Sequence, residues 1–217
     1  WVLEGLFGSC EQVTKTDELI KSGYLSNFRI KVLLCKHDPQ YFNTYQEEID
    51  YLVSHKARNR LITNLVKDIE GNTLVLFNYI EKHGEPLYEL INNSVDSKRK
   101  VFFVHGGTDV QDREEVRQLT EEEDNAVIIA SYGTFSTGIN IKRLHNIIFA
   151  SPSKSRIRNL QSIGRVLRKG EGKELATLYD IADDIGGRNY TLKHLDERVN
   201  IYKGENFKYE VIRINLQ

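Results

Sequence analysis

Apolar residues follow two different periods along the chain, and their alternation predicts an α/β protein. Short, continuous apolar runs are typical of strands that are buried on both faces. The predicted strands are residues 28–35, 73–77, 101–104, 126–131, 146–150 and 175–181. Apolar residues three or four positions apart predict helices between these runs. The predicted helices are residues 45–53, 58–69, 79–92, 109–121 and 155–169.

This order of elements predicts a doubly wound, mostly parallel sheet with helices on both faces. In such a sheet, ligands meet the loops that follow the carboxyl ends of the strands. Those loops carry the candidate chemistry of this chain: residues 105–107, 131–140, 151–153 and 183–184.

The predicted helix at 155–169 places three long polar side chains on one face. At about 100° per residue, Gln161, Arg165 and Arg168 lie within roughly 60° of one another. Two arginines one turn apart can clamp a polyphosphate, because each guanidinium stays charged and presents a rigid fork of donors. Glycine inside a helix costs up to about 1 kcal/mol relative to alanine. Gly164, directly before Arg165, therefore indicates that a ligand approaches the helix backbone closely there. The alternative is an ordinary solvated helix face.

The loop at 131–140 is rich in hydroxyl groups and glycine, so its backbone amides and side chains could hold phosphates. Gly133 and Gly138 have the spacing of a P-loop, but Ile139 and Asn140 stand where that motif needs lysine and serine or threonine. A Walker A site and a GxGxxG fingerprint are therefore both missing from the sequence. The alternative is a loop without a ligand.

Charge is segregated, although the 217 residues carry a net charge of only −1. Residues 142–173 hold nine Lys and Arg against one Glu, a net charge of +8. This basic segment suits a phosphate-rich partner. Residues 109–124 hold eight acids against two Arg, a net charge of −6, and are expected to form an exposed helix face.

Cysteine and histidine spacing predicts no metal site. Cys10 and Cys35 lack ligand spacing and are expected to be reduced and structural. No apolar stretch approaches the about 20 residues that span a bilayer, and no secretory signal opens the chain. We therefore expect a cytoplasmic protein without a membrane partner.

The loop at 131–140 and the helix at 155–169, in this order, resemble motifs of the second RecA-like domain of superfamily 2 helicases. Residues 161–168 match motif VI of that family, QxxGRxxR, and residues 131–141 are similar to motif V. Residues 74–77 are similar to motif IV, and His105-Gly106 with Arg113 is similar to the family's HG-to-Arg element. The resemblance covers roughly residues 60–185.

Further details resemble the DNA-directed branch of the superfamily. Gln161 stands where DEAD-box RNA helicases carry histidine. Residues 44–49, 131–139 and 179–184 are similar to the UvsW-type phage recombination and repair helicases. Two alternatives stay open, a motor subunit domain of a restriction enzyme and a non-catalytic nucleic-acid-binding α/β domain.

The resemblance implies a role for each candidate residue. Arg165 and Arg168 are the implied arginine fingers, and Gln161 couples the phosphate state to domain closure. The implied nucleotide-binding residues are Gly138, Asn140 and Gly164. The implied nucleic-acid contacts are Phe77, Asn78, His105, Gly106, Arg113, Ser131 and Thr134.

It also implies a division of the chain and a set of partners. Residues 1–60 are the end of a first domain, a linker and a lead-in segment; residues 61–185 are the RecA-like helicase C-terminal domain; residues 186–217 are a helix and strand that complete it. The implied partners are branched, forked or duplex DNA and the first RecA-like domain of the same polypeptide. That first domain binds most of ATP and Mg²⁺, so the chain alone is expected to be inactive.

Overall fold

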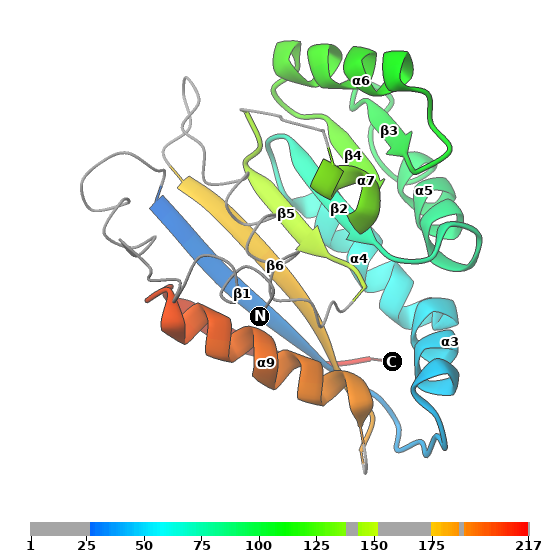
Figure 1. Ribbon diagram of the computed structural model, residues 1–217, viewed down its shortest axis with the longest axis vertical. Helices are drawn as coiled ribbons and strands as arrows, with labels where there is room; N and C mark the ends of the chain where they lie inside the picture. Colours follow the sequence, from blue (N-terminus) through cyan, green and yellow to red (C-terminus); the bar gives the residue numbers. More distant parts are fainter. Residues whose placement is uncertain (1–26, 138–142, 152–174, 187–188, 217) are drawn as a thin grey trace, which may run out of the picture.

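The computed structural model describes residues 27–137, 143–151, 175–186 and 189–216. Seven strands form one sheet in the order β3-β4-β2-β5-β6-β1-β7, and all six pairings are parallel (Figure 1). The strands are β1 (Asn27–Lys36), β2 (Thr73–Phe77), β3 (Val101–Val104), β4 (Val127–Ser131), β5 (Asn146–Phe149), β6 (Leu175–Asp184) and β7 (Tyr209–Asn215). The predicted α/β fold with a doubly wound parallel sheet is confirmed.

Helices cover both faces of this sheet. They are α3 (Tyr45–Ser54), α4 (Lys56–Asp68), α5 (Glu85–Asn92), α6 (Val110–Glu122), α7 (Tyr132–Thr137) and α9 (Tyr190–Gly204), with the π-helical turn η1 (Ile80–Gly84) before α5. In Figure 1, α9 crosses one face of β1 and β6, whereas α4 lies behind β2. The predicted helix at 155–169 falls outside the described residues.

Two predicted elements differ from the structure. The single helix expected at 79–92 is a π-helical turn followed by α5. The hydroxyl-rich loop expected from Ser131 begins with the short helix α7 instead. Ser131 explains α7, because its Oγ accepts a hydrogen bond from the Thr134 backbone N–H at 3.2 Å, as a helix N-cap does.

Successive strand residues pack into two separate cores, since side chains alternate across a sheet. Leu74 and Leu76 of β2 join a core that includes α7 and α9. Val75 and Phe77 join a core that includes α4 and α5. All five residues of β2 are buried, which explains why every residue after Thr73 is apolar.

A buried ion pair joins the carboxyl end of the sheet to α4. Arg58 Nε donates to Asp183 Oδ1 at 2.8 Å, and Arg58 Nη2 donates to Asp183 Oδ2 at 3.0 Å and to the Ala150 carbonyl at 2.9 Å. His37, just after β1, donates from Nε2 to Asp183 Oδ1 at 2.9 Å. Burial alone would raise the pKa of Asp183, but the charge of Arg58 and the hydrogen bonds lower it to about 2.

Replacing Asp183 by asparagine is expected to lower the free energy of unfolding by about 3 kcal/mol at neutral pH. The change leaves the buried Arg58 charge without its counter-ion, which is the costly way to break such a pair. Urea unfolding of Asp183→Asn measures the loss. Asp196→Asn on the exposed surface of α9 is the matched control and should stay within about 0.5 kcal/mol of wild type.

The difference in the free energy of unfolding between wild type and Asp183→Asn should depend on pH. The folded-state pKa of Asp183 lies below its ordinary value of 3.8, so its contribution is complete above that value and is lost as the pH falls towards 2. The gap between wild type and Asp183→Asn should therefore narrow in acid. Equal stability of the two proteins at neutral pH would contradict this role of the ion pair.

Candidate functional site

Loops that follow three neighbouring strands line one hollow on the surface. The hollow has a volume of about 470 Å³. The lining residues are Asn78 and Ile80 after β2, Gly106 after β3, Arg113 of α6, and Ser131, Tyr132, Gly133 and Thr134 at the end of β4. Because β3, β4 and β2 are parallel neighbours, their carboxyl ends bring these loops to the same edge.

Five of the seven residues predicted to contact nucleic acid line this hollow: Asn78, Gly106, Arg113, Ser131 and Thr134. The other two pack beside it. The Phe77 ring is fully buried and stacks on Phe103, with 5.6 Å between ring centroids, so its side chain belongs to the core. The half-buried His105 ring also lies against Phe103, at 5.3 Å.

Hydroxyl groups and glycine form one wall of the hollow. The Ser131 and Thr134 hydroxyls lie 2.8 Å apart and share a hydrogen bond. A Cβ atom on Gly133 or Gly106 would meet nothing within 4 Å, so there is space beside the backbone at both positions. Backbone amides and hydroxyls of this kind are common phosphate contacts in nucleic-acid-binding proteins.

Arg113 supplies a cation at the rim of the hollow. Its Nε donates to the Thr108 carbonyl at 2.8 Å, and the Thr108 hydroxyl accepts from the His105 backbone N–H at 3.0 Å. Among the residues that the structure describes, no carboxylate forms an ion pair with Arg113. By contrast, Arg117, one turn further along α6, pairs with Glu114 at 2.6 Å and with Glu121 at 2.9 Å. The charge of Arg113 is therefore available to an anion.

A buried polar network lies behind the loop that follows β2. The Asn78 backbone N–H donates to Ser151 Oγ at 3.3 Å, and Ser151 Oγ lies 2.8 Å from His83 Nδ1. His83 Nε2 lies 3.3 Å from Asn59 Oδ1. Burial, with a smaller effect from the charge of Arg58, lowers the pKa of His83 to about 3, so the ring is neutral in ordinary buffers.

Sequence reasoning missed this network, because its members are far apart in the chain and show no motif spacing. The one local signal is Gly84, next to His83. A Cβ atom on Gly84 would lie 2.5 Å from the Phe77 ring, so only glycine lets η1 pack this closely. This contact places η1 directly against the end of β2. π-Helical turns are frequent at functional sites.

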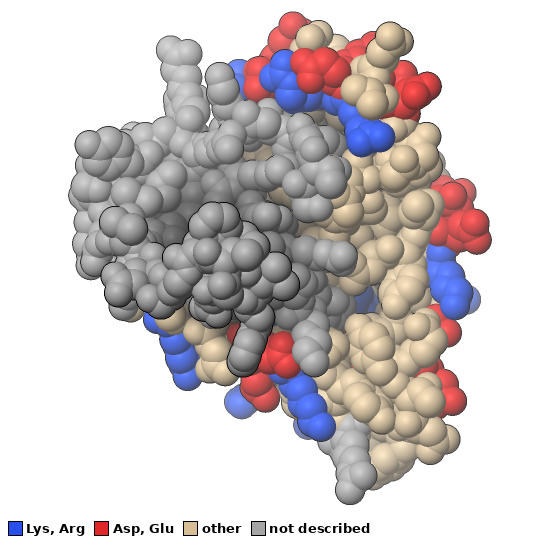
Figure 2. Space-filling model, in the orientation of Figure 1, with Lys and Arg blue, Asp and Glu red and all other residues tan. Residues whose placement is uncertain are grey.

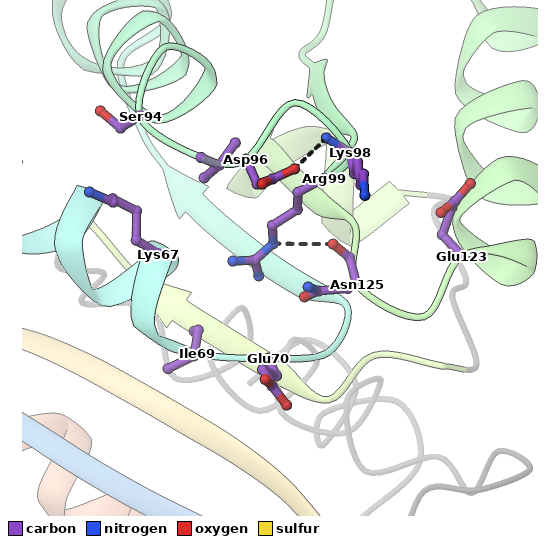
Figure 3. A pocket seen from close by; sticks show the side chains of 10 residues that line it. Lys67, Ile69, Glu70, Ser94, Asp96, Lys98, Arg99, Glu123 and Asn125 are labelled. Carbon is purple, nitrogen blue, oxygen red and sulfur yellow. Dashed lines mark hydrogen bonds between the residues drawn. The ribbon is translucent and has the colours of Figure 1, made fainter.

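A second hollow, of about 480 Å³, lies at the opposite edge of the sheet, near the amino ends of β2 and β4 (Figure 3). Its lining mixes both charges. Arg99 donates from Nε to the Asn125 carbonyl at 3.1 Å and from Nη1 to the Val66 carbonyl. Glu123 pairs with Lys100 at 2.6 Å. These charged groups bind one another or the backbone carbonyls of neighbouring loops, which indicates a structural role. The first hollow is therefore the better candidate site.

Charged side chains gather over α6 (Figure 2). Acidic residues of this helix are exposed, which confirms the expected exposed acidic face: Asp112, Glu114, Glu115 and Glu122. Most of the basic segment at 142–173 lies outside the described residues. Arg143, within the described part, forms an ion pair with Asp124.

The predicted nucleotide-handling residues lie outside the described part of the chain, so their roles stay predictions: Gln161, Arg165, Arg168, Gly138, Asn140 and Gly164. Cys35 is a free, buried cysteine, as expected, and burial raises the pKa of its thiol to about 12. Cys10 also lies outside the described residues. Across residues 27–137, 143–151, 175–186 and 189–216, no helix is long and apolar enough to cross a membrane.

Comparison with known proteins places this geometry in a family. Residues 56–170 match the model of the helicase conserved C-terminal domain. The chain is 34% identical over 233 residues to "ATP-dependent DNA helicase uvsW" of Enterobacteria phage T4, covering 98% of this chain and 46% of that protein. A mimivirus (Acanthamoeba polyphaga mimivirus) protein named as an ATP-dependent RNA helicase is 29% identical, covering 84% of this chain and 34% of its own length.

Solved structures agree with the sequence matches. The crystal structure of T4 UvsW superposes with a TM-score of 0.74 at 31% identity, covering 89% of this chain and 42% of that one. A fragment of a type I restriction enzyme HsdR subunit from Vibrio vulnificus YJ016 shares the fold, with a TM-score of 0.73 at 17% identity, covering 98% of this chain and 41% of that one. The chain thus spans less than half the length of these relatives. Its matches in sequence and structure show that it belongs to the family of helicase conserved C-terminal domains.

Proposed function

We propose that this chain is the C-terminal motor half of an ATP-dependent superfamily 2 DNA helicase or translocase that acts in DNA recombination, repair, or fork and branch remodelling. Two findings support the proposal. The family match covers residues 56–170, and similarity to the T4 protein named as an ATP-dependent DNA helicase extends over 98% of the chain. The protein then works inside the cell, where its DNA partner is found.

The hollow at the ends of β2, β3 and β4 is the observation that carries this proposal. Its lining offers an amide, two hydroxyls, glycine backbone and the Arg113 guanidinium. These groups bind the sugar-phosphate backbone rather than base edges, so binding is independent of sequence. Such binding suits a motor that moves along any DNA, and it weakens with salt because counterions are released.

The nucleotide side of the motor is assigned to two segments, one that precedes β5 and one that follows it. Arg165 and Arg168 reach the γ-phosphate of ATP, and Gln161 couples the phosphate state to closure against the first RecA-like domain. Gly138, Asn140 and Gly164 line the same nucleotide site. ATP and Mg²⁺ are held mainly by that first domain, which supplies the P-loop lysine and acidic residues. Arginine donors stabilise the charge that develops during phosphoryl transfer.

Replacing Arg168 by alanine in the full-length protein should reduce DNA-stimulated ATP hydrolysis by about 10³-fold, because an arginine finger contributes that much to phosphoryl transfer. Nucleotide binding should remain. Steady-state hydrolysis is measured with duplex, single-stranded and forked DNA and with single-stranded RNA. Lys169→Ala removes a neighbouring positive charge outside the QxxGRxxR pattern and is the matched control.

Each outcome of this experiment tests a different part of the proposal. Stimulation by RNA alone would replace DNA as the partner. Normal hydrolysis by Arg168→Ala would remove the finger role. If no nucleic acid stimulates the wild-type protein, the motor assignment fails and a non-catalytic nucleic-acid-binding domain takes its place.

A further inference from the structure

We propose that His83 is a positioning residue within a chain of hydrogen bonds: by accepting from the Ser151 hydroxyl, it turns Ser151 Oγ to accept from the Asn78 backbone N–H, and so couples the nucleic-acid loop after β2 to the end of β5. The chain runs Asn78 N–H, Ser151 Oγ, His83, Asn59. We call it the His83 relay. It rests on the proposed function, because it gives a route by which DNA contact at the hollow reaches the nucleotide-handling segment.

One set of proton positions satisfies the whole His83 relay. Asn59 Nδ2 donates to the Val53 carbonyl at 2.8 Å, so its Oδ1 faces His83 and accepts from Nε2–H. His83 Nδ1 therefore carries no proton and accepts from the Ser151 hydroxyl. Ser151 Oγ is then left to accept from the Asn78 backbone N–H. Asn78 N–H donates at the start of the line, and Ser151, His83 and Asn59 each accept once and donate once.

Burial makes this relay stiff. His83 is fully buried, Ser151 is 2% exposed and Asn59 is 5% exposed. A buried polar group that loses its hydrogen bond cannot replace it with a bond to water, and this loss is costly. A displacement of Asn78 is therefore expected to displace Ser151 and His83 as well. The low pKa of His83 keeps the ring neutral and Nδ1 able to accept. Asn78, by contrast, is exposed at the hollow, where a ligand can move it.

Ser151 is the point at which several elements of the site meet. Its carbonyl accepts from the buried Tyr132 hydroxyl of α7 at 3.1 Å, and the preceding Ala150 carbonyl accepts from Arg58 of α4. The residues that directly follow Ser151 in the sequence lead, ten positions on, to Gln161. A displacement of Ser151 therefore acts at the start of the segment that carries the predicted arginine fingers.

Two substitutions at His83 separate coupling from simple packing. A glutamine amide reaches the position of Nε2, so His83→Gln keeps a donor for Asn59 and loses the acceptor for Ser151. An asparagine amide reaches the position of Nδ1, so His83→Asn keeps the acceptor for Ser151 and loses the donor for Asn59. Both variants lose the ring and one hydrogen bond, so a merely structural role predicts the same effect for both.

The readout is the ratio of DNA-stimulated to basal ATP hydrolysis in the full-length protein, with the DNA concentration for half-maximal stimulation measured alongside. His83→Gln should lower the ratio about tenfold, within the range of coupling changes known for packed networks. His83→Asn should keep the ratio within about threefold of wild type. Half-maximal DNA concentrations should be similar for all three proteins. Thermal unfolding verifies that both variants are folded.

Ser151→Ala is the second test, and it stands even if both His83 variants fail to fold. It removes the hydroxyl and leaves the bond between His83 and Asn59, so it should lower the ratio as His83→Gln does. Wild-type stimulation in Ser151→Ala, or equal losses in His83→Gln and His83→Asn, would overturn the His83 relay. An unstimulated wild-type protein would instead defeat the proposed function itself.

Discussion

The buried ion pair between Arg58 and Asp183 holds the carboxyl edge of the sheet together, and the candidate site depends on that edge. Arg58 of α4 bonds Asp183 of β6 and the Ala150 carbonyl after β5, while His37 after β1 bonds the same carboxylate. Taking both charges out of water is expensive, so such a pair adds little net stability compared with apolar packing. Its effect is positional: it fixes the start of α4 and the carboxyl ends of β1, β5 and β6 relative to one another, and it binds the Ala150 carbonyl directly before Ser151.

Much of the fold could be predicted from the sequence, because parallel strands buried on both faces must be continuously apolar. Residues 73–77 show this directly, since all five are buried in β2, and the apolar run at 101–104 is also a strand with the predicted bounds, although it lies at the edge of the sheet. The order of strands could not be predicted, since it depends on contacts between distant segments; β1 lies between β6 and β7. The π-helical turn η1 could not be predicted either, because it depends on one close contact between Gly84 and Phe77.

The candidate site was predictable where motif residues follow the ends of neighbouring strands. Asn78, Arg113 and Ser131 come from three separate segments, yet they line one hollow because β2, β3 and β4 end at the same edge. Phe77 is the last residue of β2 and is buried in the core, whereas Asn78 follows the strand and is exposed. The His83 relay could not be found in this way, since its bonds join residues whose proximity exists only in the folded chain.

The salt dependence of DNA binding by Arg113→Ala decides whether this hollow holds the backbone of a nucleic acid. Arg117→Ala is the matched control on the same helix, because Arg117 is paired with Glu114 and Glu121. In a plot of log affinity against log salt for the full-length protein, Arg113→Ala should flatten the slope by about 1, the loss of one phosphate contact, and Arg117→Ala should leave it unchanged. An unchanged slope in Arg113→Ala would contradict the claim that this hollow contacts DNA.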